Sequence, residues 1–357
     1  MLQEFDAIII IRLSSLGDVV LSTAVLKAFR ERFPRAHLSF ITARRYADLI
    51  EHNPFIDDRV YFEDKNFIMG MMQIWGMRIK FGRGRNMLVD LHPSGWSPMR
   101  SSFWAFMLQL AIPARRKIKA KRKDFAALAR GGAIGAAGHI VDDFYAALAE
   151  LGPSAYSPPA VFLPEDEEPA SRAIHSKEDG RCRIGVHPGA SFPVKRWPED
   201  RFAELCKLLQ KEKGYLLTIF GSRKESELIH RIGKSVDTGK ARLAIGLGLK
   251  EMIRLIDECD IFIANDSGLM HLAAARGVPV ISIFGPTHPK LGFRPVGDGN
   301  VALYSDVPCS PCSRWGEKRC KLKRSICFDD IGTAKVLEAV EKMVNTKRDP
   351  ASLLCIS

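Results

Sequence analysis

The sequence lacks the features of several common classes of protein. No apolar run approaches the roughly 20 residues that a membrane-spanning helix needs. The first six residues carry two acidic side chains and no basic one, which is unlike the basic start of a secretory signal peptide. These absences predict a soluble, cytoplasmic globular protein, and the 357 residues are enough for two domains.

The eight cysteines do not indicate a disulfide scaffold, because the chain shows no export signal. Four of them lie close together in the sequence, at Cys309, Cys312, Cys320 and Cys327. This spacing could hold zinc or an iron–sulfur cluster, although the gaps after Cys312 are irregular. We favour thiols that pack near one another in a loop, and we assign no metal.

Acidic residues are too few to balance the basic ones. Lys and Arg number 53 and Asp and Glu 41, so the net charge is +12. Such an excess predicts a polyanionic partner, although a well-solvated basic surface would give the same number. The sequence contains no helix-turn-helix, RNA-binding motif or basic strand interleaved with aromatic residues, and this disfavours nucleic acid as the partner.

Predicted strands and helices alternate in two halves of the chain. Residues 7–12 are a β-branched run with no polar alternation, which is typical of a parallel strand covered on both faces. Further strands of the first half are predicted at residues 37–42 and 87–91, and a helix follows the turn at 13–17. In the second half strands are predicted at residues 183–187, 215–220, 261–265 and 280–284, with helices over 198–213 and from Gly268. The alternation predicts an α/β fold with a doubly wound parallel sheet in each half.

A change of composition separates the halves. Residues 152–169 contain five prolines among serines and acidic residues, which is typical of an interdomain linker. We predict two Rossmann-like domains, residues 1–160 and 161–357. The carboxyl ends of their strands are expected to face one interdomain cleft, where ligands of open α/β folds bind.

The turn after the first predicted strand carries the first candidate site residue. Asp18 ends the motif Ser14-Ser15-Leu16-Gly17-Asp18. At the start of a helix it could cap the helix or serve as a base that faces the cleft. The Gly-x-Gly-x-x-Gly pattern is absent here, and this disfavours a nicotinamide dehydrogenase.

Turns of the second half carry the other candidates. Lys195 follows the motif His187-Pro188-Gly189-Ala190-Ser191 and could lie against a phosphate, or in a solvated basic loop. The motif Asn265-Asp266-Ser267-Gly268-Leu269-Met270-His271 opens a helix whose N-terminus could bind an anion. Asp266 or Ser267 could instead cap that helix, and His271 could be a core residue. Glu225 could accept ribose hydroxyls or be a surface acid, and Thr287 could contact a ligand or cap a helix.

In these motifs the sequence resembles the ADP-heptose:lipopolysaccharide heptosyltransferases, glycosyltransferase family 9, which have the GT-B fold. The resemblance runs from Ile8 to about Ile331. Its most specific parts are residues 14–18, 195–198, 265–271 and 284–287. It implies an inverting transfer of heptose from ADP-heptose to a Kdo or heptose acceptor in the inner core of lipopolysaccharide.

The resemblance also implies roles for single residues. Asp18 matches the general base and Lys195 the lysine that neutralises the leaving diphosphate. Ser15 and His139 match acceptor-binding positions. The donor-binding positions are Ala190, Ser191, Glu225, Asp266, Ser267, Gly268, Leu269 and His271. Ala190 departs from the threonine frequent in the family, which leaves only a backbone contact there.

No cofactor and no metal are expected. A lysine and a helix N-terminus can neutralise a diphosphate in place of a divalent ion, and the sequence has no Asp-x-Asp motif. An acidic acceptor at the inner face of the inner membrane would explain the basic excess. Two alternatives remain, namely a transferase of the same fold with another nucleotide sugar and a non-catalytic nucleotide-binding regulator.

One segment suggests peripheral contact with the anionic inner leaflet. Residues 102–112 are strongly apolar, and a basic cluster follows them. Its members are Arg115, Arg116, Lys117, Lys119, Lys121, Arg122 and Lys123. This combination suits shallow docking on anionic lipid. The alternative is a core helix followed by a solvated loop.

Overall fold

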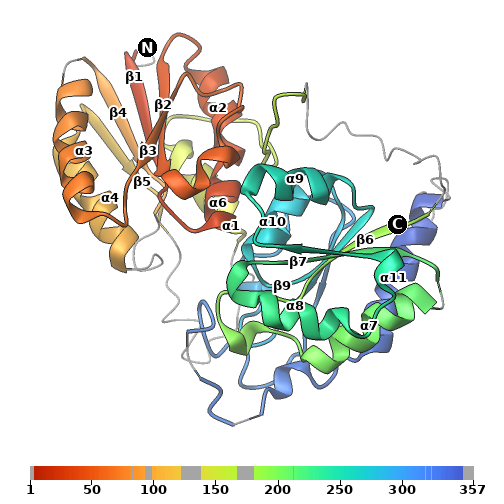
Figure 1. The fold of residues 1–357 in the computed structure, drawn as a ribbon. Helices are drawn as coiled ribbons and strands as arrows, with labels where there is room; N and C mark the ends of the chain where they lie inside the picture. Colours follow the sequence, from red (N-terminus) through yellow and green to blue (C-terminus); the bar gives the residue numbers. More distant parts are fainter. Residues whose placement is uncertain are drawn as a thin grey trace. The chain divides into compact units, whose positions relative to one another are not determined.

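Two separate parallel sheets organise the chain, each in its own structural unit (Figure 1). The computed structural model describes residues 4–82, 84–92, 99–121, 138–166, 181–211, 213–317, 319–322 and 324–348. The first unit comprises Met1–Leu128 and Gly135–Pro169, and the second comprises Ala129–Ile134 and Ala170–Ser357. Within the described residues, no helix has the length and apolar character needed to cross a membrane.

The sheet of the first unit has the strand order β3-β2-β1-β4-β5, with all neighbours parallel. The strands are β1 (Ala7–Ile11), β2 (His37–Ala43), β3 (Asp58–Phe62), β4 (Asn86–Asp90) and β5 (Arg116–Lys119). The isoleucines of β1 are completely buried, as expected of a central strand. Because the chain proceeds from β1 to one side and later returns to pair β4 on the other, the topological switch point lies between β1 and β4.

The first helix of the first unit begins earlier than the sequence predicted. They are α1 (Leu16–Ser22), α2 (Ala24–Arg32), α3 (Phe67–Lys80), α4 (Met99–Ala111) and α6 (Ile140–Ala149), with a 3-10 turn at Arg44–Leu49. The single helix expected after residue 17 is two helices. At their junction the Ser22 and Thr23 hydroxyls donate to the carbonyls of Val19 and Val20, each at 2.7 Å. Such bonds back to the preceding turn bend helices.

The second unit has the strand order β11-β10-β9-β6-β7-β8, and its switch point lies between β6 and β9. The strands are β6 (Arg183–His187), β7 (Leu216–Gly221), β8 (Ala241–Ile245), β9 (Ile261–Asn265), β10 (Val280–Ile283) and β11 (Val301–Leu303). The helices are α7 (Glu199–Lys211), α8 (Ser226–Gly233), α9 (Leu249–Asp257), α10 (Gly268–Ala275) and α11 (Thr333–Arg348). Short 3-10 turns occupy Pro193–Lys195, Arg223–Glu225, Thr238–Lys240, Pro289–Leu291 and Ile326–Phe328. The predicted doubly wound architecture is thus confirmed in each unit.

The boundary between the units lies later in the chain than residue 160. Val161, Phe162 and Leu163 are buried, and the ring of Phe162 lies 6.4 Å from that of Phe55 in the first unit. This short apolar segment therefore belongs to the core of the first unit. Pro169, at the end of the predicted linker, lies outside the described residues.

Candidate functional site

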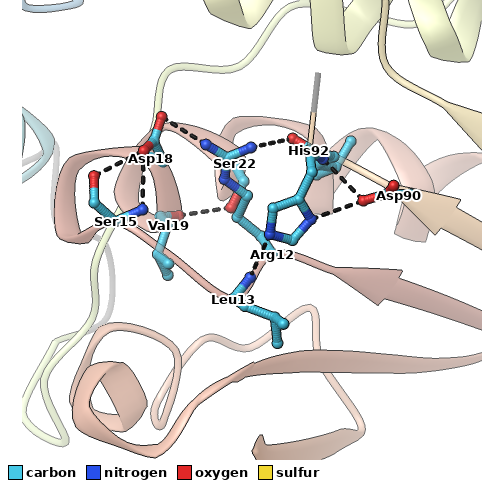
Figure 2. A network of polar contacts seen from close by, with 9 residues as sticks. Arg12, Leu13, Ser15, Asp18, Val19, Ser22, Asp90 and His92 are labelled. Carbon is cyan, nitrogen blue, oxygen red and sulfur yellow. Dashed lines mark hydrogen bonds and ion pairs between the residues drawn. The ribbon is translucent and has the colours of Figure 1, made fainter. Parts of the chain in front are cut away.

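A polar network occupies the switch point of the first unit (Figure 2). Arg12 follows β1, and only 1% of its surface is exposed. Its Nη2 atom lies 2.6 Å from Oδ1 of Asp18, and its Nη1 atom donates to the carbonyl of Leu91, just after β4. Figure 2 shows the Arg12 side chain beside Asp18. Arg12 therefore ties the start of α1 to the end of β4.

The second oxygen of Asp18 is held by the N-terminus of its own helix. Oδ2 accepts the backbone N–H of Ser15 at 2.9 Å and the Ser15 hydroxyl at 2.7 Å. Ser15 is the N-cap residue of α1. About one fifth of the Asp18 side chain (21%) stays exposed. The carboxylate is consequently fixed on both oxygens and still reachable from outside.

Asp90 and His92 complete the network from the side of β4. Nδ1 of His92 lies 2.7 Å from Oδ1 of Asp90, and Nε2 of His92 accepts the backbone N–H of Leu13 at 3.1 Å. Because Nε2 is an acceptor, the ring proton sits on Nδ1 and is donated to Asp90. Burial lowers the pKa of His92, against the opposing effect of Asp90. Burial works against ionisation of Asp90, but its contacts with His92 and the charge of Lys119 lower the pKa of Asp90.

Arg12, Asp90 and His92 were not predicted from the sequence. A signal was available, because all three are polar residues at the ends of predicted strands, where ligands of open α/β folds bind. The hydrogen bonds of Arg12 with the Leu91 carbonyl and of the Leu13 N–H with His92 each join positions 79 residues apart in the chain. These contacts became visible only with the pairing of β1 and β4.

The two predicted acceptor-side residues both occupy helix N-caps. Ser15 has its hydroxyl engaged by Asp18. His139 precedes α6, and its Nδ1 accepts the backbone N–H of Val141 at 3.2 Å. Both residues therefore cap the N-terminus of a helix. Their contact with an acceptor stays a prediction.

In the second unit Lys195 belongs to a buried ion pair. Its Nζ lies 2.7 Å from Oδ2 of Asp266, which also accepts the Thr287 hydroxyl at 2.6 Å. Only 9% of Lys195 is exposed. A Cβ at Gly316, where φ is +87°, would lie 2.4 Å from Cγ of Lys195, so the backbone there packs directly on the lysine stem. These contacts exclude the alternative of a solvated basic loop for Lys195.

Glu225 is a buried acid rather than a surface one. Its Oε2 accepts the backbone N–H and the hydroxyl of Ser222 at 2.9 and 2.7 Å, and Nε2 of His187 lies 3.8 Å away. Burial opposes ionisation, but the His187 ring and the Ser222 hydrogen bonds outweigh it and lower the pKa of Glu225 to about 2. A Cβ at Gly189 would lie 2.1 Å from Oε1 of Glu225, so only glycine fits there.

The end of β9 joins the loops around it. Asn265 accepts the backbone N–H of Trp197 at 2.9 Å and donates to the carbonyl of Pro188 at 2.8 Å. Ser267 is the N-cap of α10, and its hydroxyl lies 3.1 Å from Nδ1 of His187. Asn265 therefore fixes the segment that carries Lys195 against the start of α10.

The remaining predicted donor residues lie along these loops. Gly268 is the first residue of α10, and Leu269 and His271 are buried within it. Ala190 is buried and its carbonyl accepts from Arg196 at 3.2 Å, whereas Ser191 is exposed. The donor-side candidates follow β6, β7, β9 and β10, which are neighbours in the sheet. The structure thus gathers an ammonium group, a helix N-terminus and an ionised carboxylate at one sheet edge, which suits a ligand with anionic and hydroxyl groups.

The four clustered cysteines line one cavity together with Val194 and Pro286. Burial, and then the neighbouring thiols, raise the pKa of Cys327 to about 12, which favours the thiol form. Across the described part of the chain, no group of three or more His, Cys, Asp or Glu side chains is arranged to hold a metal ion. The cluster lies beside the segment that carries Lys195, because Val194 lines the same cavity.

Solved structures share this architecture. A glycosyltransferase of family 9 from Veillonella parvula superimposes with a TM-score of 0.76 at 22% identity, over 96% of this chain and 98% of that one. The ADP-heptose lipopolysaccharide heptosyltransferase II of E. coli gives a TM-score of 0.71 at 21% identity, over 96% of this chain and all (100%) of that one. Two doubly wound units with polar residues at their switch points place the chain in the GT-B class of folds.

The sequence comparisons assign the family. The family model described as glycosyltransferase family 9 (heptosyltransferase) matches residues 101–323, and the chain belongs to this family. The lipooligosaccharide heptosyltransferase 2 of Campylobacter jejuni serotype O:6 is 34% identical over 172 residues, which are 46% of this chain and 52% of that protein. The chain therefore spans about half the length of this relative.

Proposed function

We propose that the protein is an inverting glycosyltransferase that transfers heptose from ADP-heptose to a Kdo or heptose acceptor in the inner core of lipopolysaccharide. The observation that carries the proposal is the grouping of Lys195, Asp266 and the N-terminus of α10 at the switch point of the second unit. A buried ammonium group beside a helix N-terminus suits a diphosphate leaving group. Membership of glycosyltransferase family 9 supports the reaction class.

The donor is proposed to bind the second unit. Lys195 would leave Asp266 to neutralise the diphosphate, helped by the backbone N–H groups at the start of α10. Glu225, which its low pKa keeps ionised at neutral pH, would accept the ribose hydroxyls. The other donor contacts are proposed at Ala190, Ser191, Ser267, Gly268, Leu269 and His271. No divalent ion and no cofactor are needed in this scheme.

Asp18 is proposed as the general base in the first unit. As the acceptor oxygen attacks C1 of the heptose, its proton passes to the Asp18 carboxylate. The bond from C1 to the diphosphate oxygen breaks, and the electron pair leaves with ADP, so the configuration at C1 inverts. Arg12 and Ser15 would hold the carboxylate in one orientation for this proton transfer.

The domain arrangement follows from these roles. We propose that the first unit binds the acceptor and the second unit binds the donor. An acceptor assembled on the inner leaflet would place the protein in the cytoplasm, in peripheral contact with the inner membrane. The net charge of +12 suits such an anionic acceptor and surface.

The decisive experiment measures ADP release from a panel of nucleotide sugars, with and without a lipopolysaccharide core acceptor. We expect release from ADP-heptose that depends on the acceptor and that EDTA leaves unchanged. Preference for another sugar would favour the alternative donor. Tight ADP binding without turnover of any donor would favour a nucleotide-binding regulator. Activity that EDTA abolishes and magnesium restores would overturn the metal-free scheme.

A further inference from the structure

Helices α3 and α4 expose an unusual amount of apolar surface. Ten of the thirteen large hydrophobic side chains exposed in the described ranges lie on these two helices. They are Phe67, Ile68, Met69, Met71, Met72, Trp75, Ile79, Phe103, Phe106 and Leu110. We call this set the α3–α4 face. A concentration of this kind marks an interaction surface, because isolated exposed apolar residues are normally scattered.

Helix α3 is apolar on its outward side as well as on its inward side. Its inward positions Gly70, Ile74 and Met77 are buried against the core. Residues at i, i+4, i+8 and i+12 from Phe67 form the outward stripe, which includes Trp75 at 69% exposure. An outward stripe of a surface helix normally carries charged or polar side chains. On α3 it carries phenylalanine, methionine, tryptophan and isoleucine.

The exposed residues of the two helices form one continuous surface. A Cβ at Gly70 would lie 2.7 Å from the Trp104 ring, so the glycine lets α3 approach α4 closely. The rings of Phe67 and Phe103 lie 5.6 and 5.1 Å from that of Trp104. Figure 1 shows α3 and α4 side by side on the same face of the first sheet. The apolar side chains of α3 therefore continue onto α4.

The two segments that build this face carry charge of one sign. Residues 65–82 and 99–121 contain no Asp or Glu. Their basic residues are Lys65, Arg78, Lys80, Arg100, Arg115, Arg116, Lys117, Lys119 and Lys121. Some of these have partners elsewhere, such as Lys80 with Asp58 at 2.7 Å and Lys119 with Asp90 at 3.6 Å. The segments that build the face nevertheless contribute only positive charge.

We propose that the α3–α4 face docks on an anionic lipid bilayer. The apolar side chains would enter the headgroup region, Trp75 would sit at the interface with water, and the surrounding cations would contact anionic headgroups. A second copy of the chain is a poorer occupant, because two such faces would bring rows of like charges together. The inference rests on the proposed function only in that a lipid-linked acceptor requires a nearby membrane.

This surface overlaps only in part with the one that the sequence suggested. Within residues 102–112 the side chains of Trp104, Ala105, Leu108, Ala111 and Ile112 are buried, whereas Phe103, Phe106 and Leu110 are exposed and belong to the α3–α4 face. The following basic cluster is no solvated loop, since Arg116–Lys119 forms the edge strand β5. Arg122 and Lys123 lie outside the described residues. Most of the exposed apolar surface belongs to α3.

The test is vesicle flotation with the full-length protein. We expect binding to vesicles that contain about 30% phosphatidylglycerol, and much weaker binding to phosphatidylcholine alone or at high salt. The Ile68→Ser/Trp75→Ser variant should lose at least about tenfold in affinity, because two side chains no longer enter the bilayer. The control variant Tyr156→Ser/Leu322→Ser removes apolar residues that are each 54% exposed elsewhere and should bind like wild type.

Three outcomes would overturn the proposal. The first is equal affinity of the α3 variant and wild type for anionic vesicles. The second is equal loss of affinity in the control variant. The third is a stable dimer in light scattering that the α3 substitutions dissociate, since the face would then cover a second copy.

Failure of docking and failure of the proposed function can be told apart. With a water-soluble core acceptor the α3 variant should retain wild-type turnover, because its two substitutions lie outside the proposed catalytic residues. Asp18→Asn should bind anionic vesicles like wild type. Vesicle binding that depends on α3, together with no sugar transfer by the wild type, would retain the docking surface and reject the transferase.

Discussion

The Nη2 atom of Arg12 lies 2.6 Å from Oδ1 of Asp18, and the two side chains differ sharply in exposure. The arginine is sealed in the interior, whereas the carboxylate keeps an open side. Because Arg12 pairs with Asp18 from the interior of the unit, the solvent-facing side of the carboxylate can be reached by a substrate. This geometry is what a fixed proton acceptor requires.

Replacing Asp18 by asparagine tests the role of the carboxylate. Asparagine keeps the shape but cannot take a proton, so turnover should fall by about two to four orders of magnitude. Affinity for ADP should be unchanged, because the donor-side residues lie in the other unit. The matched control is Asp6→Asn, which alters a surface ion pair with Arg85 and should leave turnover intact. An Asp18→Asn enzyme as fast as wild type would end the proposed role.

The ion pair between Arg12 and Asp18 can be measured by a double-mutant cycle in urea. Arg12→Met should lower the free energy of unfolding by about 2–3 kcal/mol, less than for a fully buried pair because Asp18 is partly exposed. Adding Asp18→Asn should cost about 1 kcal/mol less than the sum of the single changes. Strict additivity would mean that the contact contributes nothing to folding.

Lys195→Met tests the proposed diphosphate contact. Loss of a charged hydrogen bond to phosphate should weaken ADP binding by about 10- to 100-fold, and turnover should fall as well. Calorimetric titration with ADP measures the first effect and the donor assay the second. Lys213→Met removes a lysine that pairs with Glu341 at the surface and serves as the control. Unchanged ADP affinity in Lys195→Met would remove the lysine from the phosphate site.

The buried acid Glu225 predicts a pH-dependent contribution to stability. Its pKa is about 2 in the folded protein against an ordinary value of 4.5. The ionised form therefore stabilises the fold fully above pH 4.5, and this stabilisation is lost as the pH falls through 2. The difference in unfolding free energy between wild type and Glu225→Gln should be constant near neutral pH and shrink below 4.5.

Urea titrations at successive pH values measure this difference. Glu227→Gln is the control, because the Glu227 side chain is 92% exposed, and its difference from wild type should stay near zero. A difference for Glu225→Gln that is the same at every pH would show that the ionised carboxylate does not stabilise the fold.

Central strands with mostly apolar sequences could be predicted closely. The predicted strands at 183–187 and 261–265 coincide with β6 and β9, because buried parallel strands need apolar residues on both faces. The strand β5 was missed, because an edge strand tolerates the charged sequence of Arg116–Lys119, which resembles a basic loop. Periodicity therefore predicts central strands better than edges.

The residues of the site also differ in how well the sequence predicts them. Lys195, Glu225 and Asp266 could be identified because each lies in the loop that follows a predicted strand. Arg12 and His92 could not, because their roles depend on how β1 and β4 align across many intervening residues. Local motifs predict which side chains reach a sheet edge, while the pairing register decides which of them meet.

The pairing of Lys195 with Asp266 also bears on which anions the second unit can admit. An anion that binds Lys195 must displace the Asp266 carboxylate from the lysine ammonium group. Asp266 then keeps its hydrogen bond from the Thr287 hydroxyl. A small monovalent anion makes too few contacts to replace this ion pair, whereas a diphosphate can contact the lysine and the nearby N–H groups through several oxygens. We therefore expect acetate and chloride to compete poorly with ADP, because the Lys195–Asp266 ion pair disfavours the binding of weakly interacting anions.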